Sequence, residues 1–350
     1  MKVINNTNKI LKFQEVFSRM LDMVSGVKNG TNDEILWLLQ HNDVFTIGKS
    51  GTAADIIDKT IDYVETDRGG QMTYHGTGQM IAYSILDVKK HFNSDVRKYV
   101  TFLQKTIVDS LGYFGIEAFG DTDLIGVWVE KNGIKKKIAS MGIRISGGIS
   151  YHGVAVNISP DLENFKKIIP CGISDFGVTS CQDLGFDVDI EKFAEVFIEK
   201  FAVNLIQSDK FVSHAAIFNQ QRFLYCQKRS ALRKHFPSTW ELCGGSSEDG
   251  ESAKQSLDRE IPEEINISKW KNFGVIYFTE CSVDGVKKVY IVFWLKITDW
   301  RGFKLEDGKA VDHKFINVDE INILSENTVA FNAAKTAFEI CHDLMLNSDR

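Results

Sequence analysis

The sequence places a cysteine between a proline and a glycine, in the segment KIIPCGIS of residues 167–174. Pro170 restricts the backbone just before Cys171, and Gly172 leaves room after it, as a reactive thiol requires. A free thiol has a pKa of about 8.5, and a nearby lysine ammonium lowers that pKa and raises the thiolate fraction at neutral pH. Cys171 is therefore a candidate nucleophile. The alternative is a structural cysteine, because free cysteine is among the most buried residue types.

A lysine suited to this role stands in the segment KKKIASMG of residues 135–142. The apolar residues that follow predict a strand, in which Lys135 and Lys137 point to one face and Lys136 to the other. Lys137 is the candidate partner of the cysteine. The alternative is a solvated run of lysines.

Two further segments combine glycines with histidines: DRGGQMTYHGTGQ of residues 67–79 and SYHGVAVN of residues 150–157. Glycines permit tight turns and let the backbone come close to a ligand. Their N–H groups could line an anion-binding nest or an oxyanion site. His75 and His152 are candidates for chemistry, with ordinary core or surface histidines as the alternative.

A second constellation lies in GGSSEDGESAKQSLDREIPEEINI, residues 244–267. On a helix, its carboxylates at 260, 263 and 264 share one face, where like charges are costly unless a cation neutralises them. Hard oxygen ligands of this kind suit Mg²⁺ or Mn²⁺ bridging a diphosphate, and the alternative is a solvated acidic helix. The spacing Gly-x5-Glu-x7-Arg-Glu-x2-Glu-Glu is formed by Gly245, Glu251, Arg259, Glu260, Glu263 and Glu264. Arg259 can pair with Glu251 and fix the junction between loop and helix.

The hydrophobic pattern predicts the helices and strands that must position these residues. Helices are expected over 10–26, 96–116, 190–206 and 327–346, with one more after the Gly-Gly pair at 244–245. Strands are expected within 34–48 (two strands around a turn), 78–88, 126–130, 136–146, 149–159, 211–219, 222–230, 271–283 and 287–298. The pattern restarts near 207–212, which predicts an N-terminal domain over 1–209 and a C-terminal domain over 210–350. Both are expected to be of the α/β (α+β) class.

The composition is that of an ordinary globular protein, with 43% hydrophobic and 25% charged residues and a formal net charge of −6. Neither half is basic, so nucleic acid is not an expected partner. The 6 cysteines include no CxxC pair, which argues against a disulfide framework and a zinc site and favours a reducing compartment. No signal-peptide pattern and no membrane-spanning run is present, so a cytoplasmic protein without a membrane partner is expected.

The motifs RGGQMTYHGTGQ, KIASMGIRI, YHGVAVNIS and PCGISDFGVTS together resemble the lipoyl(octanoyl) transferase family, in order and at family-like spacing. The resemblance implies a mixed-sheet fold of the biotin- and lipoate-protein ligase type, and a catalytic pair that falls on Cys171 and Lys137. The substrate-binding residues that it implies are Arg68, Gly69, Gly70, Gln71, Met72, Thr73, Tyr74, His75, Ser140, Met141, Gly142, Gly153, Val154 and Ala155. Two features depart from the family pattern: Thr77 stands where proline is usual, and SGGIS at 146–150 replaces a basic-aromatic stretch.

The resemblance also implies a reaction, in which an octanoyl group passes from octanoyl-acyl carrier protein to a lysine of lipoyl domains in 2-oxoacid dehydrogenase-type complexes. The Cys171 thiolate would form a thioester with the acyl group, and the lysine amine would convert that thioester into an amide. Lys137 would first stabilise the thiolate and then accept a proton, while the glycine-lined backbone or His75 would stabilise the oxyanion. No cofactor is expected for this transfer. The alternative is an ATP-dependent lipoate-protein ligase, against which the cysteine argues.

The glutamate-rich segment resembles a Nudix box, and STWELCGG before it and FINVDEI after it resemble that family's flanks. The resemblance implies an α/β/α sandwich that hydrolyses a nucleoside diphosphate derivative with a metal-activated water. The Mg²⁺ or Mn²⁺ ligands would be Glu260, Glu263 and Glu264, and the residues with structural roles would be Gly245, Glu251 and Arg259.

Two residues depart from the Nudix pattern. Pro262 stands inside the box helix, where proline removes a backbone hydrogen bond, and Asn266 replaces the box glycine. Asn tolerates a left-handed backbone better than most residues. The alternative for this half is therefore a non-catalytic nucleotide-binding or regulatory module. Asp312 is a candidate for an additional carboxylate.

Overall fold

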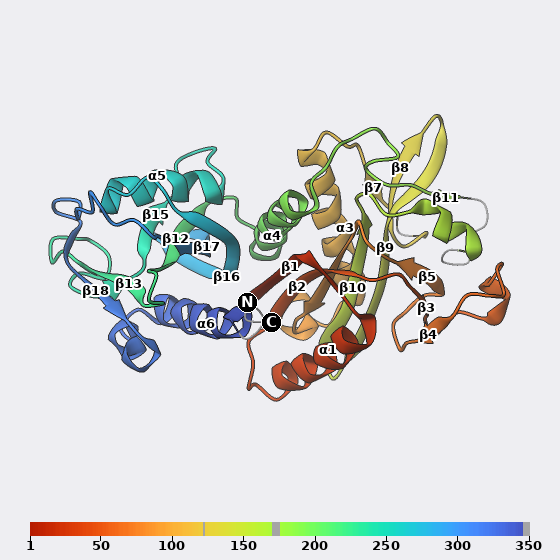
Figure 1. Cartoon of the computed structure of the whole chain (residues 1–350), viewed down its shortest axis with the longest axis horizontal. Coiled ribbons are helices and arrows are strands. Elements are labelled where there is room, and N and C mark those ends of the chain that lie inside the picture. The colour runs from red at the N-terminus through yellow and green to blue at the C-terminus, as the bar shows by residue number, and fades with distance from the viewer. Residues whose placement is uncertain (122, 170–175, 346–350) are drawn as a thin grey trace. The chain divides into compact units, whose positions relative to one another are not determined.

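The computed structural model of the chain describes residues 1–121, 123–169 and 176–345. The chain folds into two compact units (Figure 1). The N-terminal unit is Ile4–Leu205, and the C-terminal unit is Ile206–Arg350 together with Met1–Val3. The first residues of the chain belong to the C-terminal unit because the Met1 ammonium donates to the Phe278 carbonyl over 2.7 Å.

The N-terminal unit is built on a mixed sheet with the strand order β1-β2-β6-β10-β9-β8-β7, and β11 pairs with β9. These strands are β1 Lys2–Leu11, β2 Ile35–His41, β6 Gln79–Ile85, β7 Phe119–Gly120, β8 Val127–Lys131, β9 Ile134–Ser146, β10 Ile149–Asn157 and β11 Gly177–Val178. A second, small sheet has the order β4-β3-β5, with β3 Val44–Ile47, β4 Tyr63–Glu65 and β5 Met72–His75. Every residue of β2, β6 and β10 is buried, because both faces of the main sheet are covered.

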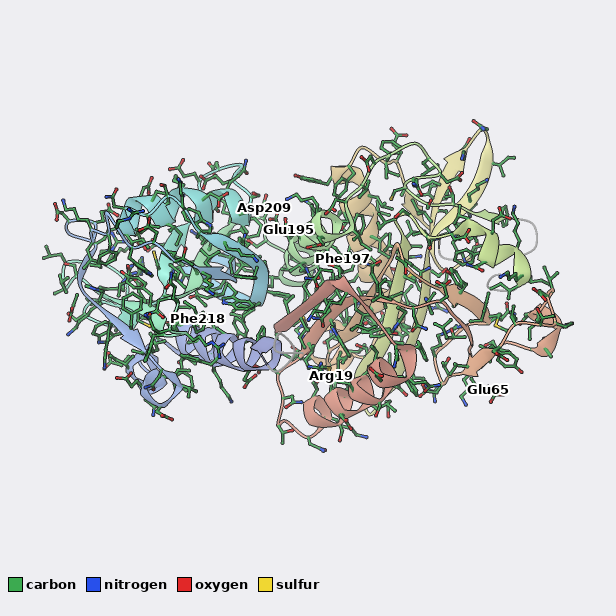
Figure 2. All side chains as sticks on the ribbon, viewed as in Figure 1. Arg19, Glu65, Glu195, Phe197, Asp209 and Phe218 are labelled. Carbon is green, nitrogen blue, oxygen red and sulfur yellow. The ribbon has the colours of Figure 1, made fainter. Side chains whose placement is uncertain are left out.

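The helices of this unit are α1 Phe13–Lys28, α2 Val88–Phe92, α3 Val96–Tyr113 and α4 Ile190–Ile206, with 3-10 turns η1 Ala53–Asp55 and η2 Leu162–Lys167. The apolar face of α1 packs on β6 and β10 through Met20, Tyr83 and Tyr151. On α3, Phe102 meets Phe201 of α4 with the ring centroids 4.8 Å apart. Phe197 of α4 is fully buried (Figure 2).

The structure differs from the sequence-based prediction at the start of the chain. The helix expected over 10–26 begins at Phe13, and Ile10 and Leu11 belong to β1. The strand was missed because its middle is the polar run Asn5-Asn6-Thr7, which gives no apolar alternation. Tertiary hydrogen bonds hold it instead, such as Gln40 Nε2 donating to the Thr7 carbonyl over 2.5 Å.

The C-terminal unit has the strand order β14-β13-β12-β17-β16, with β15 beside β12 and β18 beside β13. Its strands are β12 Phe211–Phe218, β13 Leu224–Arg229, β14 Trp240–Glu241, β15 Cys243–Ser246, β16 Lys271–Val283, β17 Val286–Lys296 and β18 Ala310–Ile316. Helices α5 Ala253–Ile265 and α6 Thr328–Met345 lie on opposite sides of β12 and β17 (Figure 1), and a 3-10 turn covers Val318–Leu324. The mixed α/β architecture predicted for both halves is confirmed. No helix among the described residues is long and apolar enough to cross a membrane.

Local sequence signals are fulfilled in this unit. The turn between β16 and β17 consists of Asp284 and Gly285, both with positive φ (53° and 76°), as an Asp-Gly pair favours. Ser252 caps the N-terminus of α5 by accepting from the Gln255 N–H over 3.2 Å. The same helix continues through Pro262 and ends at Asn266, whose φ of 55° is the left-handed conformation expected of that asparagine.

Candidate active site

One pocket in the N-terminal unit gathers segments that are far apart in the sequence. Its empty volume, open mouth included, is about 500 Å³. The lining residues are Phe13, Arg68, Gly70, Gln71, Thr73, His75, Ile81, Tyr83, Ser140, Met141, Gly142, His152, Gly153, Val154 and Ala155. The segments 68–75, 140–142 and 153–155 that were predicted to bind substrate therefore meet in one place.

Three residues of the predicted set do not line this pocket. Side chains alternate along a strand, so Thr73 and His75 of β5 face the pocket, whereas Met72 and Tyr74 pack in a hydrophobic cluster on the other face. Gly69 instead makes a backbone hydrogen bond, in which its N–H donates to the Ile143 carbonyl of β9 over 3.1 Å.

Arg68 is a buried cation that organises the loop in front of β5. Its guanidinium donates to the Thr46 carbonyl over 2.8 Å, to the Gln71 carbonyl over 2.7 Å and to the Gly69 carbonyl over 2.9 Å. Gly142 permits this arrangement, because a Cβ there would stand 3.0 Å from the Arg68 Cδ. Arg68 thus fixes one wall of the pocket through backbone carbonyls.

Lys137 lies on β9 and is only 5% exposed, so the alternative of a solvated lysine run is wrong for this residue. Its Nζ lies 4.7 Å from the centroid of the Trp128 ring and donates to the Ile125 carbonyl over 3.3 Å. Lys135 lies over the same ring, also at 4.7 Å, and pairs with Asp121. The two lysines therefore point to the same side of the strand, as predicted.

Cys171, the predicted nucleophile, lies outside the described residues. The described residues on either side of it are held firmly. Ile169 donates its N–H to the Asp55 carbonyl over 2.7 Å. On the other side, β11 pairs in parallel with β9, and Val178 is the register partner of Lys137. The chain that follows the cysteine is therefore tied to the strand that carries the candidate lysine.

Three histidines surround the pocket, and each is tied to a neighbour. His75 Nδ1 lies 2.7 Å from the Gln79 Oε1. His41, which stands behind the pocket-lining Tyr83, has its Nε2 2.8 Å from that phenol oxygen. His152 Nε2 donates to the Asp67 carboxylate over 2.9 Å. Burial is the first cause that lowers the pKa of all three, to about 3 for His75 and about 4 for His41, so the His75 and His41 rings are uncharged at neutral pH.

Four lining residues were absent from the predicted substrate-binding set: Phe13, Ile81, Tyr83 and His152. Tyr83 and Ile81 are the register partners of Gly153 and Ala155, so strand pairing is what brings them to the pocket. Their types indicate only core positions in the sequence, and the register needed to find them is a tertiary property. His152 could have been found from the sequence, because a histidine directly precedes the glycine at 153. In the structure its φ is 55°, which is unusual inside a strand.

In the C-terminal unit, the arginine of the glutamate-rich helix α5 joins most of the predicted residues. Arg259 binds Glu251 through two nitrogens, each at 2.9 Å, and also donates to Glu260 over 2.8 Å and to Glu263 over 3.4 Å. Gly245 leaves room for this cluster, because a Cβ there would overlap the Glu260 carboxylate in its present position. The loop before α5 and the helix itself are thereby locked together.

The glutamates of α5 do not share one environment. Glu260 and Glu264 are buried, whereas Glu263 is exposed. Glu264 accepts from the Gly244 N–H over 2.8 Å and from Gln227 over 3.0 Å. Burial, and then the neighbouring Glu241, raise the pKa of Glu264 to about 7.

Glu241 is a functional candidate that the sequence did not reveal. It is buried on the short strand β14 and pairs with Arg229 over 2.5 Å, and Gln227 links it to Glu264. Its distance along the sequence from the glutamates of α5 does not indicate a shared site, because it lies on β14, a different element. Asp312, the additional carboxylate considered from the sequence, is exposed on β18.

The donor chemistry of this cluster fits a hard divalent cation, because such ions prefer carboxylate oxygens as ligands. The arrangement is nevertheless closed in this conformation. Arg259 donates hydrogen bonds to the carboxylates of Glu260 and Glu263, and Lys309 Nζ lies 3.6 Å from the second carboxylate oxygen of Glu260. Within the described part of the chain, no group of three or more His, Cys, Asp or Glu side chains is arranged to hold a metal. Glu260 and Glu264, with Glu263 at the surface, are the residues that could hold one after these pairs open.

Comparisons with known proteins match two separate parts of the chain to two families. The family model for the lipoyl protein ligase A/B catalytic domain matches residues 13–202, and that for the NUDIX domain matches residues 211–337. An octanoyltransferase of Wolbachia pipientis wMel is 40% identical over 195 residues, which are 56% of this chain and 95% of that protein. An octanoyltransferase of Ehrlichia canis (strain Jake) is 43% identical over 192 residues, 55% of this chain and 90% of that protein.

Among solved structures, a bi-partite lipoate protein ligase with its E2 lipoyl domain from Thermoplasma acidophilum has 18% sequence identity and a TM-score of 0.46, covering 59% of this chain and 84% of that one. The family models and the relatives confirm both assignments made from the sequence motifs. The chain therefore belongs to the lipoyl protein ligase A/B catalytic domain family and is an acyltransferase that also carries a NUDIX domain.

Proposed function

We propose that the N-terminal unit transfers an octanoyl group from octanoyl-acyl carrier protein to a lysine of lipoyl domains, through a thioester on Cys171. The main support is the convergence of the segments 68–75, 140–142 and 153–155 on a single pocket. That pocket combines apolar walls for an alkyl chain with a few polar groups at fixed positions, as ligand sites usually do. The similarity to octanoyltransferases supports octanoyl as the acyl group and transfer as the reaction type.

Lys137 is the residue proposed to activate the thiol. A buried ammonium next to a cysteine favours the thiolate, which is the nucleophilic form. The lysine is held by Trp128 and the Ile125 carbonyl, and neither of these is an acid that would neutralise its charge. Chain connectivity supports the pairing, because Val178, which follows Cys171 after a few residues, lies beside Lys137 in the sheet.

The proposed reaction balances in two steps. In the first, the thiolate attacks the carrier thioester, the octanoyl–sulfur bond to the carrier breaks, and the Lys137 ammonium gives its proton to the departing carrier thiolate. In the second, the neutral lysine amine of the lipoyl domain attacks the enzyme thioester. The carbon–nitrogen bond forms, Cys171 leaves as a thiolate, and the now neutral Lys137 takes the proton from nitrogen. The pair returns to its starting charges.

The acyl chain is proposed to lie against Phe13, Ile81 and Val154, with Met141 and Ala155 completing the apolar lining. The backbone of Gly70 and Gly142 would approach the ligand closely, while Arg68 holds the wall in place rather than binding the substrate. Met72, Tyr74 and Gly69 support the pocket from behind. These assignments refine the substrate-binding set predicted from the sequence.

The transfer is tested by mixing the full chain with octanoyl-acyl carrier protein and a lipoyl domain in the absence of ATP. The expected result is a lipoyl domain heavier by one octanoyl group. The rival ligase reaction is tested in parallel with free octanoate and ATP, which we expect to give no product. Product only in the second mixture would replace the transferase by an ATP-dependent ligase.

For the C-terminal unit we propose hydrolysis of a nucleoside diphosphate derivative with Mg²⁺ or Mn²⁺. A divalent ion bound there would supply a nucleophilic water and polarise the diphosphate. Glu260, Glu263 and Glu264 would hold the ion, and Arg259 with Glu251 would hold the helix and loop in register. The support is the NUDIX match together with the buried carboxylates of Glu241, Glu260 and Glu264.

Isothermal titration with Mn²⁺ tests this proposal on the full chain, with Glu264→Gln as the test variant and Asp249→Asn, a fully exposed carboxylate, as the control. Binding should be lost in the first variant and retained in the second. A panel of nucleoside diphosphate derivatives with Mg²⁺ then identifies the substrate. No carboxylate-dependent Mn²⁺ binding would favour a non-catalytic module.

A further inference from the structure

A chain of buried hydrogen bonds runs from the pocket to the strand that carries Lys137. His75 Nδ1 lies 2.7 Å from Gln79 Oε1, and Gln79 Nε2 donates to Asn157 Oδ1 over 2.8 Å. Asn157 Nδ2 then donates to the Thr179 carbonyl over 3.0 Å, and the Thr179 N–H donates to the Lys137 carbonyl over 2.9 Å. The chain therefore connects β5, β6, β10 and β9.

The direction of every bond in this chain is fixed, because a backbone carbonyl can only accept. The Thr179 carbonyl requires the NH₂ group of Asn157 on its side, so the Asn157 oxygen faces Gln79. Gln79 Nε2 also faces the Tyr74 carbonyl at 3.3 Å, which fixes the same amide independently. The Gln79 oxygen must then face His75, and His75 Nδ1 must carry the hydrogen.

The other ring nitrogen of His75 is consequently an acceptor. The ring is uncharged, since burial and next the neighbouring His41 lower its pKa to about 3. With its hydrogen on Nδ1, it presents a lone pair at Nε2. His75 lines the pocket, and no described residue is hydrogen-bonded to this nitrogen.

His41, which does not line the pocket, provides a comparison, because both of its ring nitrogens have hydrogen-bond partners. Its Nδ1 faces the Leu11 carbonyl at 3.2 Å, so this ring also carries its hydrogen on Nδ1. Its Nε2 is filled by the Tyr83 hydroxyl at 2.8 Å. The two rings are neighbours with centroids 6.1 Å apart, and only the acceptor of His75 is left to the pocket.

We propose that His75 Nε2 accepts a hydrogen bond from the incoming lysine amine and orients it toward the enzyme thioester, a role that rests on the transfer proposed above. The amine nitrogen then attacks the carbonyl carbon with one N–H held by His75. The carbon–sulfur bond breaks, and Lys137 takes the proton that nitrogen loses. His75 itself keeps its protonation state throughout, because a ring held neutral by burial orients the amine without taking its proton.

This assignment corrects one expectation from the sequence, in which His75 was a candidate donor to the oxyanion. A neutral ring with its hydrogen engaged by Gln79 has no hydrogen left to donate to the pocket. Stabilisation of the oxyanion therefore remains with backbone N–H groups.

The first experiment reads the ring directly. Long-range ¹H–¹⁵N spectra of the full chain with ¹⁵N-histidine, assigned by loss of the signal in His75→Asn, should show a protonated Nδ1 and an unprotonated Nε2 at pH 7. His41 should give the same pattern and serves as the internal control. A hydrogen on Nε2, or an imidazolium at pH 7, would overturn the proposal.

The second experiment separates the two half-reactions. The asparagine side chain in His75→Asn retains a donor toward Gln79 but lacks the acceptor at the Nε2 position, whereas glutamine can place a carbonyl oxygen there. With octanoyl-acyl carrier protein, His75→Asn should form the acyl-enzyme at a rate within a few-fold of the wild type. Its discharge to a recombinant lipoyl domain should slow by on the order of 100-fold, the cost of losing orientation at the reacting centre. His75→Gln should recover part of that loss.

The outcomes separate this role from the transferase itself. Equal slowing of both half-reactions in His75→Asn, or unchanged discharge, would overturn the role of His75 alone. If the wild-type chain forms no acyl-enzyme, the proposed function fails and this role fails with it. The spectra would still show which nitrogen of the His75 ring carries the hydrogen.

Discussion

The two units handle buried polar groups in different ways. In the N-terminal unit, His75 and His41 are neutral, and backbone carbonyls direct their hydrogen atoms, through Gln79 and Asn157 for His75 and directly at Leu11 for His41. In the C-terminal unit, formal charges are buried against each other, with Arg259, Arg229 and Lys309 facing Glu260 and Glu241. A transfer reaction between an acyl chain and an amine needs fixed hydrogen-bond directions in an apolar pocket. Diphosphate chemistry with a metal needs concentrated negative charge that a cation can meet.

The largest effect is expected at Lys137. Replacing it by methionine keeps the length and the contact with Trp128 but removes the charge and the proton acceptor. Transfer should fall by roughly 10²–10⁴-fold, the usual contribution of a positioned acid–base group. The pH profile for alkylation of Cys171 should also move to higher pH, since the thiolate loses a positive neighbour.

Lys135→Met is the matched control, because Lys135 lies over the same Trp128 ring at the same 4.7 Å. Transfer in this variant should stay within a few-fold of the wild type. Equal losses in both variants would mean that the lysines matter only for packing, and an unchanged alkylation profile in Lys137→Met would remove the pairing with the thiol.

Acid should weaken the N-terminal unit through its neutral histidines. Burial holds the pKa of His41 at about 4, below the ordinary value of about 6.5. Between about pH 6.5 and 4, His41 is therefore protonated in the unfolded chain but remains neutral in the folded chain. The stabilisation is complete above about pH 6.5 and is lost as the pH falls toward 4, by about 3 kcal/mol for this ring.

Urea unfolding of the full chain at several pH values measures this effect. His41→Asn keeps a donor for the Leu11 carbonyl and does not titrate, so it should unfold with a smaller loss of stability between pH 6.5 and 4. His235→Asn, at a partly exposed histidine of the C-terminal unit, is the control and should behave like the wild type. A wild-type pH dependence in His41→Asn would contradict the assignment.

A smaller effect should mark the metal cluster. In Gly245→Ala the added methyl group would overlap Glu260 and push its carboxylate away. Mn²⁺ affinity should fall by about 10–100-fold, as for other residues that orient metal ligands. Calorimetry against Asp249→Asn measures it, and unchanged affinity would show that Glu260 is not part of the site.

The sequence was most informative where the pattern is local. The turn at Asp284–Gly285, the cap at Asn266 and the strands around the glycine motifs were all predictable from residue types. The pocket-facing side of β5 was predictable in principle, because alternation separates Thr73 and His75 from their neighbours, although the predicted set kept the whole segment.

Other parts depended on contacts that no local pattern encodes. Phe13 reaches the pocket only because β1 ends just before it and turns the chain into α1. Glu241 approaches Glu264 through strand pairing between β13 and β14. The direction of the His75 ring followed from hydrogen bonds of Gln79 and Asn157, which lie on different strands from His75. Residue types indicated which side chains could take part in chemistry, whereas their orientation depends on tertiary contacts.

The central claim is that Cys171 carries the acyl group, and intact-mass analysis of the full chain after incubation with octanoyl-acyl carrier protein tests it most directly. The account predicts a mass increase of one octanoyl group that maps to the peptide containing residues 167–174, disappears when a lipoyl domain is added, and is absent in Cys171→Ala. An adduct on another residue, or normal octanoylation of the lipoyl domain by Cys171→Ala, would contradict it.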